Sequence, residues 1–189
     1  MRKFSKLLLL VTCLPVLQAC VPIIAGGVGT GITIAYDRRT PGIFIEDQSL
    51  EVKAQKRLSE KLKDQVHVNI TSYNLALLLT GEAPTPTLRA ETETIVQAVP
   101  NVRQVFNEIA VATISNFSNR SNDGFITTKV KSHMVEANKF NIVHVKVVTE
   151  ASTVYLLGIV TRKEAEDATE IARTTSGVTK VVRLFEYLD

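Results

Sequence analysis

Cysteine is scarce in this sequence of 189 residues, which contains only Cys13 and Cys20. Cys13 lies in an apolar stretch, residues 7–17, that follows a basic start and is too short to span a bilayer. A basic start, a short apolar run and small residues before a cleavage point are typical of an export signal, which we assign to residues 1–19. Removal of this signal leaves Cys20 as the only cysteine, which excludes a disulfide within the mature chain.

An excess of charge of either sign is also absent from the mature chain. The full sequence has 22 basic and 19 acidic residues, and residues 1–19 contain three basic and no acidic ones, so 19 of each remain. The basic pI of about 8.9 therefore belongs to the export signal. A neutral chain without clusters of basic and aromatic residues gives no reason to expect nucleic-acid binding.

Side chains with the spacing of a metal site are lacking as well. His67 and His144 precede two similar apolar segments, and imidazoles at paired positions can bind zinc or copper. No cysteine or carboxylate at ligand spacing accompanies them, so we interpret both as polar side chains on the first strands, facing solvent or a neighbouring domain. His133, which stands near Lys131, receives the same interpretation. We predict no metal and no cofactor.

An arrangement of residues suited to catalysis is not found either. No serine stands between glycines at the spacing of a nucleophile elbow. The pairs Glu91/Glu93 and Glu164/Glu166 are close to basic residues, and we expect both pairs on exposed helix faces as solvated charges. The glycines at positions 26–31 precede no domain helix, so they do not form a phosphate-binding loop. We therefore predict a protein that is not an enzyme.

The sequence does contain an internal repeat. Residues 68–81 and 145–158 share alternating apolar positions and end in glycine, and a histidine precedes each segment. The repeat predicts two copies of one module, called the first and second modules below. Further matched pairs are Asp47 and Asp123, Leu50 and Ile126, Lys53 and Lys129, Ile95 and Ile171, Val102 and Val178, and Val105 and Val181.

The pattern in each module predicts the order helix, strand, strand, helix, strand. In the first module, apolar residues recur every fourth position from Leu50 to Leu62, in a helix with Asp47 or Ser49 as its N-cap. Alternating residues predict a hairpin over 66–79, and Pro86 begins the second helix. We expect an α+β fold in which two helices pack on a three-stranded sheet in each module, and the two modules to pack together. The predicted core stripes of the second module are Ile126, Val130, Met134 and Ala137 in its first helix, and Ala165, Ala168, Ile171 and Ala172 in its second.

These patterns divide the chain into five segments. Residues 1–19 are the export signal, and 20–46 form a tether rich in glycine that ends in a polar, turn-forming lead. The first module takes 47–114 and the second 123–189. Between them, 115–122 form a polar linker whose one aromatic residue is Phe117.

The residues at the cleavage point, Leu17-Gln18-Ala19-Cys20, resemble the lipobox of bacterial lipoproteins. This resemblance implies that the Cys20 thiol is joined to diacylglycerol and that the new amino terminus is acylated, with palmitate-type chains. One acyl chain holds a protein only marginally, whereas two or three anchor it stably. In such lipoproteins, a residue other than aspartate directly after the lipidated cysteine favours transfer to the outer membrane. Because Val21 follows Cys20, the resemblance also implies delivery to the outer membrane.

The two modules are similar to BON domains, which occur in bacterial periplasmic proteins. The similarity lies in the paired element order, in the glycines that end each hairpin, Gly81 and Gly158, and in Ser176-Gly177-Val178 before the last strand. With the lipobox, the tether and the lead Asp37-Arg38-Arg39-Thr40, the whole chain resembles dual BON-domain outer-membrane lipoproteins. The resemblance implies a lipid-anchored protein that faces the periplasm, supports outer-membrane integrity and is enriched at cell-division sites. Asn101 departs from the pattern of Gly177, although asparagine also tolerates a left-handed backbone.

The first helices of the two modules differ on their outer faces. At about 100° per residue, the second module's helix presents apolar residues opposite its core stripe, whereas the equivalent face in the first module is polar except for Val52. An aromatic ring at a helix start beside lysines suits insertion into an anionic lipid surface. The resemblance implies that this helix binds phosphatidylglycerol or cardiolipin. The predicted lipid-binding residues are Phe125, Thr128, Lys131, Ser132, Val135 and Lys139.

Two alternatives to lipid binding stay open at this point. Phe125 and Val135 could pack against the linker, Phe117 or the first module, since single exposed apolar residues are common. The same face could also dock in a groove of a protein partner. The chain would then be an adaptor for outer-membrane assembly or envelope-stress factors.

Overall fold

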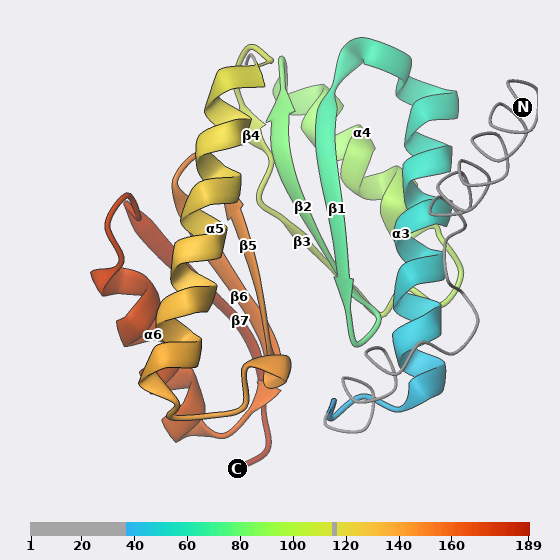
Figure 1. The fold of residues 1–189 in the computed structure, drawn as a ribbon. Coiled ribbons are helices and arrows are strands. Elements are labelled where there is room, and N and C mark those ends of the chain that lie inside the picture. Colours follow the sequence, from blue (N-terminus) through green and yellow to red (C-terminus); the bar gives the residue numbers. More distant parts are fainter. Residues whose placement is uncertain (1–36, 115–116) are drawn as a thin grey trace, which may run out of the picture. The chain divides into compact units, whose positions relative to one another are not determined.

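The computed structural model describes residues 37–114 and 117–189, with side chains described from residue 122 onward in the second stretch (Figure 1). These residues belong to one compact unit, Tyr36–Asp189. The predicted export signal, Cys20 and most of the tether lie outside the described residues. No helix within the described ranges is both long enough and apolar enough to cross a membrane.

The first module combines two helices with a mixed sheet. Strand β1 is antiparallel to β2, while β3 and β4 both run parallel to β2, so they act as one interrupted third strand. The elements are α3 (Pro41–Leu62), the 3-10 turn η2 (Lys63–Gln65), β1 (His67–Tyr73), β2 (Ala76–Ala83), α4 (Pro86–Gln97), β3 (Gln104–Asn107) and β4 (Ala110–Val111).

The second module repeats this order with an uninterrupted third strand. Strand β5 is antiparallel to β6, and β7 runs parallel to β6 over its whole length. The predicted α+β fold with two tandem modules is therefore confirmed. The elements are α5 (Phe117–Ala137), the 3-10 turn η3 (Ile142–His144), β5 (Val145–Glu150), β6 (Thr153–Val160), α6 (Arg162–Thr174) and β7 (Lys180–Tyr187).

Each module has an apolar core between its helices and one face of its sheet. In the first module, the stripe of α3 from Leu50 to Leu62 is buried against Leu77 and Leu79 of β2, as predicted. In the second, Ile126, Val130 and Met134 are buried against β5 and β6. The prediction that Ala137 continues this stripe is wrong, because it is the last residue of α5 and is exposed.

Both first helices begin earlier than the sequence pattern predicted. The N-cap of α3 is Thr40, whose hydroxyl accepts a hydrogen bond from the Ile43 amide, and Pro41 occupies the first helical position. The predicted N-cap, Asp47, lies inside the helix, and residues 41–46 are helical. Proline after threonine is a recognised helix start, and the prediction passed over it. In the second module the backbone of 117–122, predicted as linker, belongs to α5, so Phe125 is not at the helix start.

Asp47 and its repeat counterpart Asp123 hold the hairpin turns of their modules. In the first module, the Asp47 carboxylate accepts hydrogen bonds from both backbone amides of the β1–β2 turn, at 2.9 and 2.8 Å. Asp123 accepts the equivalent pair at the β5–β6 turn, both at 2.9 Å. These bonds fix the left-handed backbone that a tight hairpin requires. The turn residues with positive φ are Asn74, Leu75, Ala151 and Ser152.

Asn101 of the first module stands where the second module has Gly177. Both residues have a left-handed backbone. Their φ angles are 71° and 96°. The prediction that asparagine would satisfy the turn in the first module is therefore confirmed, because asparagine is among the few residues that adopt this conformation readily.

Candidate functional site

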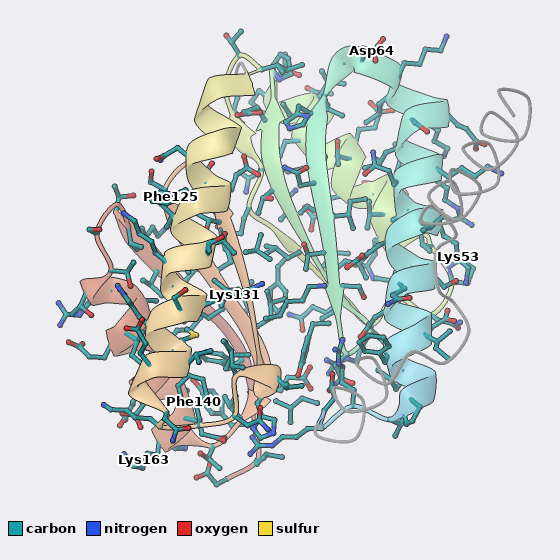
Figure 2. The ribbon with its side chains drawn as sticks, in the orientation of Figure 1. Lys53, Asp64, Phe125, Lys131, Phe140 and Lys163 are labelled. Carbon is teal, nitrogen blue, oxygen red and sulfur yellow. The ribbon has the colours of Figure 1, made fainter. Side chains whose placement is uncertain are left out.

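The outer face of α5 carries exposed apolar side chains. Phe125 is 60% exposed and Val135 is 59% exposed. The rest of the predicted lipid-binding set, Thr128, Lys131, Ser132 and Lys139, is exposed on the same helix or just after its end. In Figure 2, Phe125 and Lys131 lie along α5 and Phe140 follows its end. Within the described residues, neither Phe125 nor Val135 is covered by the first module.

Two adjoining hollows lie along this face and share Val135. The first has a volume of about 370 Å³ and lies between successive turns of α5. The second has a volume of about 380 Å³ and lies where α5 ends. The face therefore has shallow hollows that are lined by both polar and apolar side chains. The first hollow is lined by Thr128, Lys131, Ser132, Val135 and Glu136, and the second by Val135, Asn138, Lys139, Phe140, Asn141 and Ile142.

The lysines on α5 have different electrostatic surroundings. Lys139 donates a hydrogen bond of 2.9 Å to Asp167, and this bond together with one from Lys163 lowers the pKa of the Asp167 carboxyl. No acidic partner of Lys131 is found among the described residues. Of the two predicted lipid-binding lysines, Lys139 is already bound to a carboxylate, whereas Lys131 is bound to none in the described part of the chain. An anionic ligand could therefore bind Lys131 without displacing a carboxylate.

Lys129 was missed by the sequence argument and lies beside Phe125. Its Nζ is 4.6 Å from the centroid of the Phe125 ring and donates to the Ser176 hydroxyl at 3.1 Å. A lysine over an aromatic face restrains both side chains. The four-residue spacing between Phe125 and Lys129 is the sequence signal that could have shown this contact.

Helix α3 has more exposed apolar surface than the sequence comparison indicated. Val52 is 69% exposed, and Ile45, one turn into the helix, is 66% exposed. Ile45 was overlooked because the helix was expected to begin after it. Glu46 and Lys53, which directly follow Ile45 and Val52 in the chain, form a salt bridge of 3.3 Å. The contrast between α3 and α5 thus lies in the exposed aromatic ring of Phe125.

The histidines do not assemble a metal site within the described residues, where no group of three or more suitable ligands occurs. His144 lies in η3 and not on a strand as expected, and its Nδ1 is 3.3 Å from a carboxylate oxygen of Glu164. His133 Nδ1 is 3.0 Å from the Thr175 hydroxyl. Glu91, Glu93 and Glu166 are exposed as predicted, but the same prediction for Glu164 is wrong, because its side chain is only 15% exposed.

The two sheets meet through the faces that the helices leave uncovered. Tyr73 and Leu78 of the first module and Tyr155 and Leu157 of the second form one buried cluster. Burial, followed by the nearby charges of Glu108 and Glu150, raises the pKa of the Tyr155 hydroxyl to about 12. The modules therefore pack together, as their small size led us to expect.

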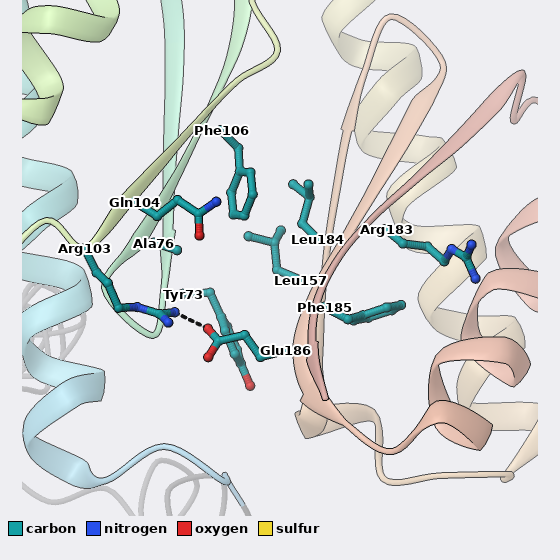
Figure 3. Close-up of a pocket in the computed structure, with 10 residues that line it drawn as sticks. All are labelled: Tyr73, Ala76, Arg103, Gln104, Phe106, Leu157, Arg183, Leu184, Phe185 and Glu186. Atoms are coloured by element: carbon teal, nitrogen blue, oxygen red, sulfur yellow. Dashed lines mark hydrogen bonds and ion pairs between the residues drawn. The ribbon is translucent and has the colours of Figure 1, made fainter. Parts of the chain in front are cut away.

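A pocket of about 270 Å³ opens at one edge of this contact (Figure 3). Phe106 points toward Leu157 and Leu184 across it, whereas Arg183 points away from it. An ion pair between Arg103 and Glu186 spans the modules at the pocket. Asn74 also donates a hydrogen bond to Glu186, so polar contacts flank the apolar cluster.

Comparison with known proteins identifies the two modules. Residues 46–113 and 122–189 each match the BON domain family. The chain belongs to the BON domain family. The first and second modules are thus its first and second BON domains, and the resemblance expected from the sequence is confirmed.

Relatives extend the similarity of this BON protein to nearly the whole chain. It is 36% identical over 187 residues to the outer membrane lipoprotein DolP of Haemophilus influenzae, which covers 98% of this chain and 97% of that protein. It is 31% identical over 158 residues to a protein named 21 kDa hemolysin from Actinobacillus pleuropneumoniae, covering 82% of this chain and 81% of that one. This BON protein is therefore an outer-membrane lipoprotein of the DolP family.

Comparison with solved structures found a match to the C-terminal domain of CdsD, a structural protein of the type III secretion system of Chlamydia trachomatis. It shares 12% sequence identity and covers 77% of this chain and 98% of that domain, with a TM-score of 0.30.

Proposed function

We propose that this BON lipoprotein is anchored through acylated Cys20, faces the periplasm and binds anionic phospholipid through α5 of its second BON domain. In this way it supports outer-membrane integrity and is enriched at division sites. Its action requires no catalytic step. The observation that carries the proposal is the exposed Phe125 ring on a helix face that also presents Lys131 and Val135.

Exposure of the Phe125 ring to water is energetically unfavourable. Transfer of a phenylalanine side chain out of water is worth about 2 kcal/mol, and the interface of a bilayer can supply that environment. Lysines near the inserted ring meet phosphate groups, each contributing about 1 kcal/mol near an anionic surface. Lys131 suits this role better than Lys139, because Lys139 must leave Asp167 to reach a phosphate.

The anchor makes such a weak contact effective. Acyl chains at Cys20 would hold the second BON domain within a tether's length of the membrane, so that helix binding becomes an intramolecular event. The acyl chains select a membrane of any composition, whereas α5 selects regions rich in anionic lipid. Anchoring by the acyl chains and selection of anionic lipid by α5 together support enrichment at particular membrane sites.

Vesicle binding by the mature chain with Cys20→Ser tests the proposal, because that variant lacks the anchor and keeps every described residue. We expect it to bind phosphatidylglycerol or cardiolipin vesicles more tightly than phosphatidylcholine vesicles. Phe125→Glu should raise the apparent Kd by at least about tenfold, since the apolar transfer energy is lost.

Val52→Glu is the matched control, because Val52 is at least as exposed on the equivalent helix of the first BON domain. It should leave vesicle binding unchanged. Equal binding by the parent and a correctly folded Phe125→Glu variant would refute the proposal. That result, together with loss of binding to an outer-membrane assembly protein, would support the adaptor function in its place.

A further inference from the structure

The residues just before α3 contact both BON domains. Arg38 and Arg39 are adjacent in the chain, yet their side chains go to different domains. Arg39 binds Asp47 in the first domain, and Arg38 binds Glu164 in the second, 126 positions away. This segment is also where the tether reaches the folded unit.

Arg39 is held firmly in the first domain. Its side chain is only 8% exposed and forms ion pairs with Asp37 at 2.6 Å and with Asp47 at 2.8 Å. The guanidinium carbon lies 4.1 Å from the centroid of the Tyr73 ring. Since Asp47 also holds the β1–β2 turn, this part of the segment is integral to the first domain.

Arg38 makes the corresponding connection to the second domain. Its two terminal nitrogens donate to the two carboxylate oxygens of Glu164, at 2.7 and 2.9 Å, and one of them also donates to the Ile159 carbonyl at 2.8 Å. A bidentate ion pair of this kind is stronger and more directional than a single hydrogen bond. The side chains of Arg38 and Glu164 are 25% and 15% exposed, so water competes less than at an open surface pair.

Glu164 is itself fixed by the second domain. Its carboxylate accepts the Thr161 amide at the start of α6, which completes a capping box, and lies beside His144. Although burial raises the pKa of Glu164, hydrogen bonds from Arg38, Thr161 and His144 bring it down to about 2. The acceptor for Arg38 is therefore a preorganised, ionised group.

The position of this contact matters because the chain crosses between the domains at a different place. The crossing runs from β4 to α5, and Figure 1 shows β4 and the start of α5 at one end of the unit and the start of α3 at the other. A single covalent crossing at one end leaves the opposite end free to open. The contact of Arg38 helps to hold that end closed, and other polar contacts between the domains, from Asn74 and Arg103 to Glu186 and from Lys146 to Glu51, act beside it.

We propose that Asp37–Arg39 is a clasp that locks the second BON domain to the first at the point where the tether arrives. With the clasp closed, the two domains move as one body and the lipid anchor acts on both. With the clasp open, the domains are joined by the β4–α5 crossing, the contact between the sheets and the remaining polar contacts of Glu186 and Lys146. The clasp is a conformational device and does not depend on lipid binding by α5.

The distance between the domains provides the test. The mature chain with Cys20→Ser contains no cysteine, so spin labels can be placed at Gln55→Cys on α3 and Glu166→Cys on α6, both exposed positions. We expect a single narrow distance distribution in this background. Arg38→Ala should broaden it or add a longer distance, because the bidentate contact that helps to hold the end opposite the crossing is lost.

Two further variants separate the clasp from a general loss of stability. Arg57→Ala is the matched control, since Arg57 donates to the Ala98 carbonyl within the first domain at 2.6 Å. Its distance distribution should equal that of the parent. Glu164→Gln keeps the capping box and removes the charge that Arg38 binds, so it should broaden the distribution as Arg38→Ala does. The double variant Arg38→Ala/Glu164→Gln should then broaden the distance distribution little more than either single variant.

Amide hydrogen exchange gives an independent readout. Arg38→Ala should speed exchange by about tenfold at residues 37–43, where one strong charged contact no longer holds the segment. An unchanged distance distribution in both Arg38→Ala and Glu164→Gln would overturn the clasp, as would equal broadening in Arg57→Ala.

Discussion

Glu164 shows how a single carboxylate can serve several donors at once. Its folded pKa of about 2 lies below the ordinary value of 4.5, so the ionised form is favoured by the fold. A group with a lowered folded pKa stabilises the protein fully above its unfolded pKa. That stabilisation disappears as the pH falls from about 4.5 toward 2.

This pKa shift leads to a prediction about acid unfolding. The midpoint of urea unfolding should fall as the pH is lowered from 5 to 2.5, and Glu164→Gln should make this fall smaller, because the variant has no proton to gain at this site. Glu166→Gln, at an exposed position on the same helix, is the control and should behave as the parent. Circular dichroism at each pH measures the midpoint. A fall as steep in Glu164→Gln as in the parent would show that this carboxylate is not responsible.

The sequence could place Glu164 on a helix but not in a network. Local charge patterns describe neighbours along one helix, and by that criterion Glu164 and Glu166 are equivalent. They differ because Arg38, far away in the sequence, is brought to Glu164 by the packing of two domains. Phe125 and Val135 were easier to assign, because helical periodicity alone separates an outer face from a buried one.

At the scale of elements, the repeated glycines are explained by the hairpins. The repeat pairs Val68 with Gly81 and Val145 with Gly158 across adjacent strands. A Cβ on Gly158 would lie 2.3 Å from the backbone carbonyl oxygen of His144, and one on Gly81 would lie 2.1 Å from the equivalent oxygen of His67. Close approach of two backbones therefore requires glycine in both copies.

Replacement of one of these glycines should be strongly destabilising. We expect Gly158→Ala to lower the free energy of unfolding by roughly 3 kcal/mol, because the obstructing atom is backbone and cannot move aside cheaply. Gly124→Ala is the matched control, since nothing lies within 4 Å of a Cβ added there in α5. It should stabilise the protein by about 0.5–1 kcal/mol through helix propensity. Urea unfolding of both variants measures the difference, and a Gly158→Ala variant as stable as the parent would contradict the steric argument.

The elements themselves were predictable to different degrees. Four-residue periodicity identified the buried stripes of α3 and α5, because burial depends on which face meets the sheet. The start of α3 was missed because the signal of Thr40 followed by Pro41 was passed over. The start of α5 was missed because a polar run such as residues 117–122 is equally acceptable as linker or as helix. Asp47 and Asp123 were recognised as equivalent, but their partners lie in hairpin turns that no local pattern connects to a helix.

At the scale of the whole molecule, the contact between the sheets makes two small domains into one unit. The alternating pattern assigned the odd positions of β2 to the helix side and left Leu78 to the other face. That residue is fully buried, and its neighbours Leu77 and Leu79 are too. An unbroken apolar run in a strand indicates burial on both faces, so the run already implied a second layer. Which residues of the other domain supply that layer could not be read from the sequence, because the pairing of Tyr73 with Tyr155 and Leu157 depends on domain orientation.

Tyr155 makes this contact sensitive to alkaline pH. Its folded pKa of about 12 lies above the ordinary value of 10, so its contribution is fully present below pH 10 and is lost as the pH rises from about 10 to 12. An ionised phenolate between two apolar sheets, near Glu108 and Glu150, would disfavour their packing.

We expect the urea midpoint to fall between pH 9 and 11.5, and Tyr155→Phe to reduce that fall. Tyr187→Phe is the control, because Tyr187 is 44% exposed and should leave the pH dependence as it is in the parent. An undiminished fall in Tyr155→Phe would mean that Tyr155 is not the group through which base weakens this contact.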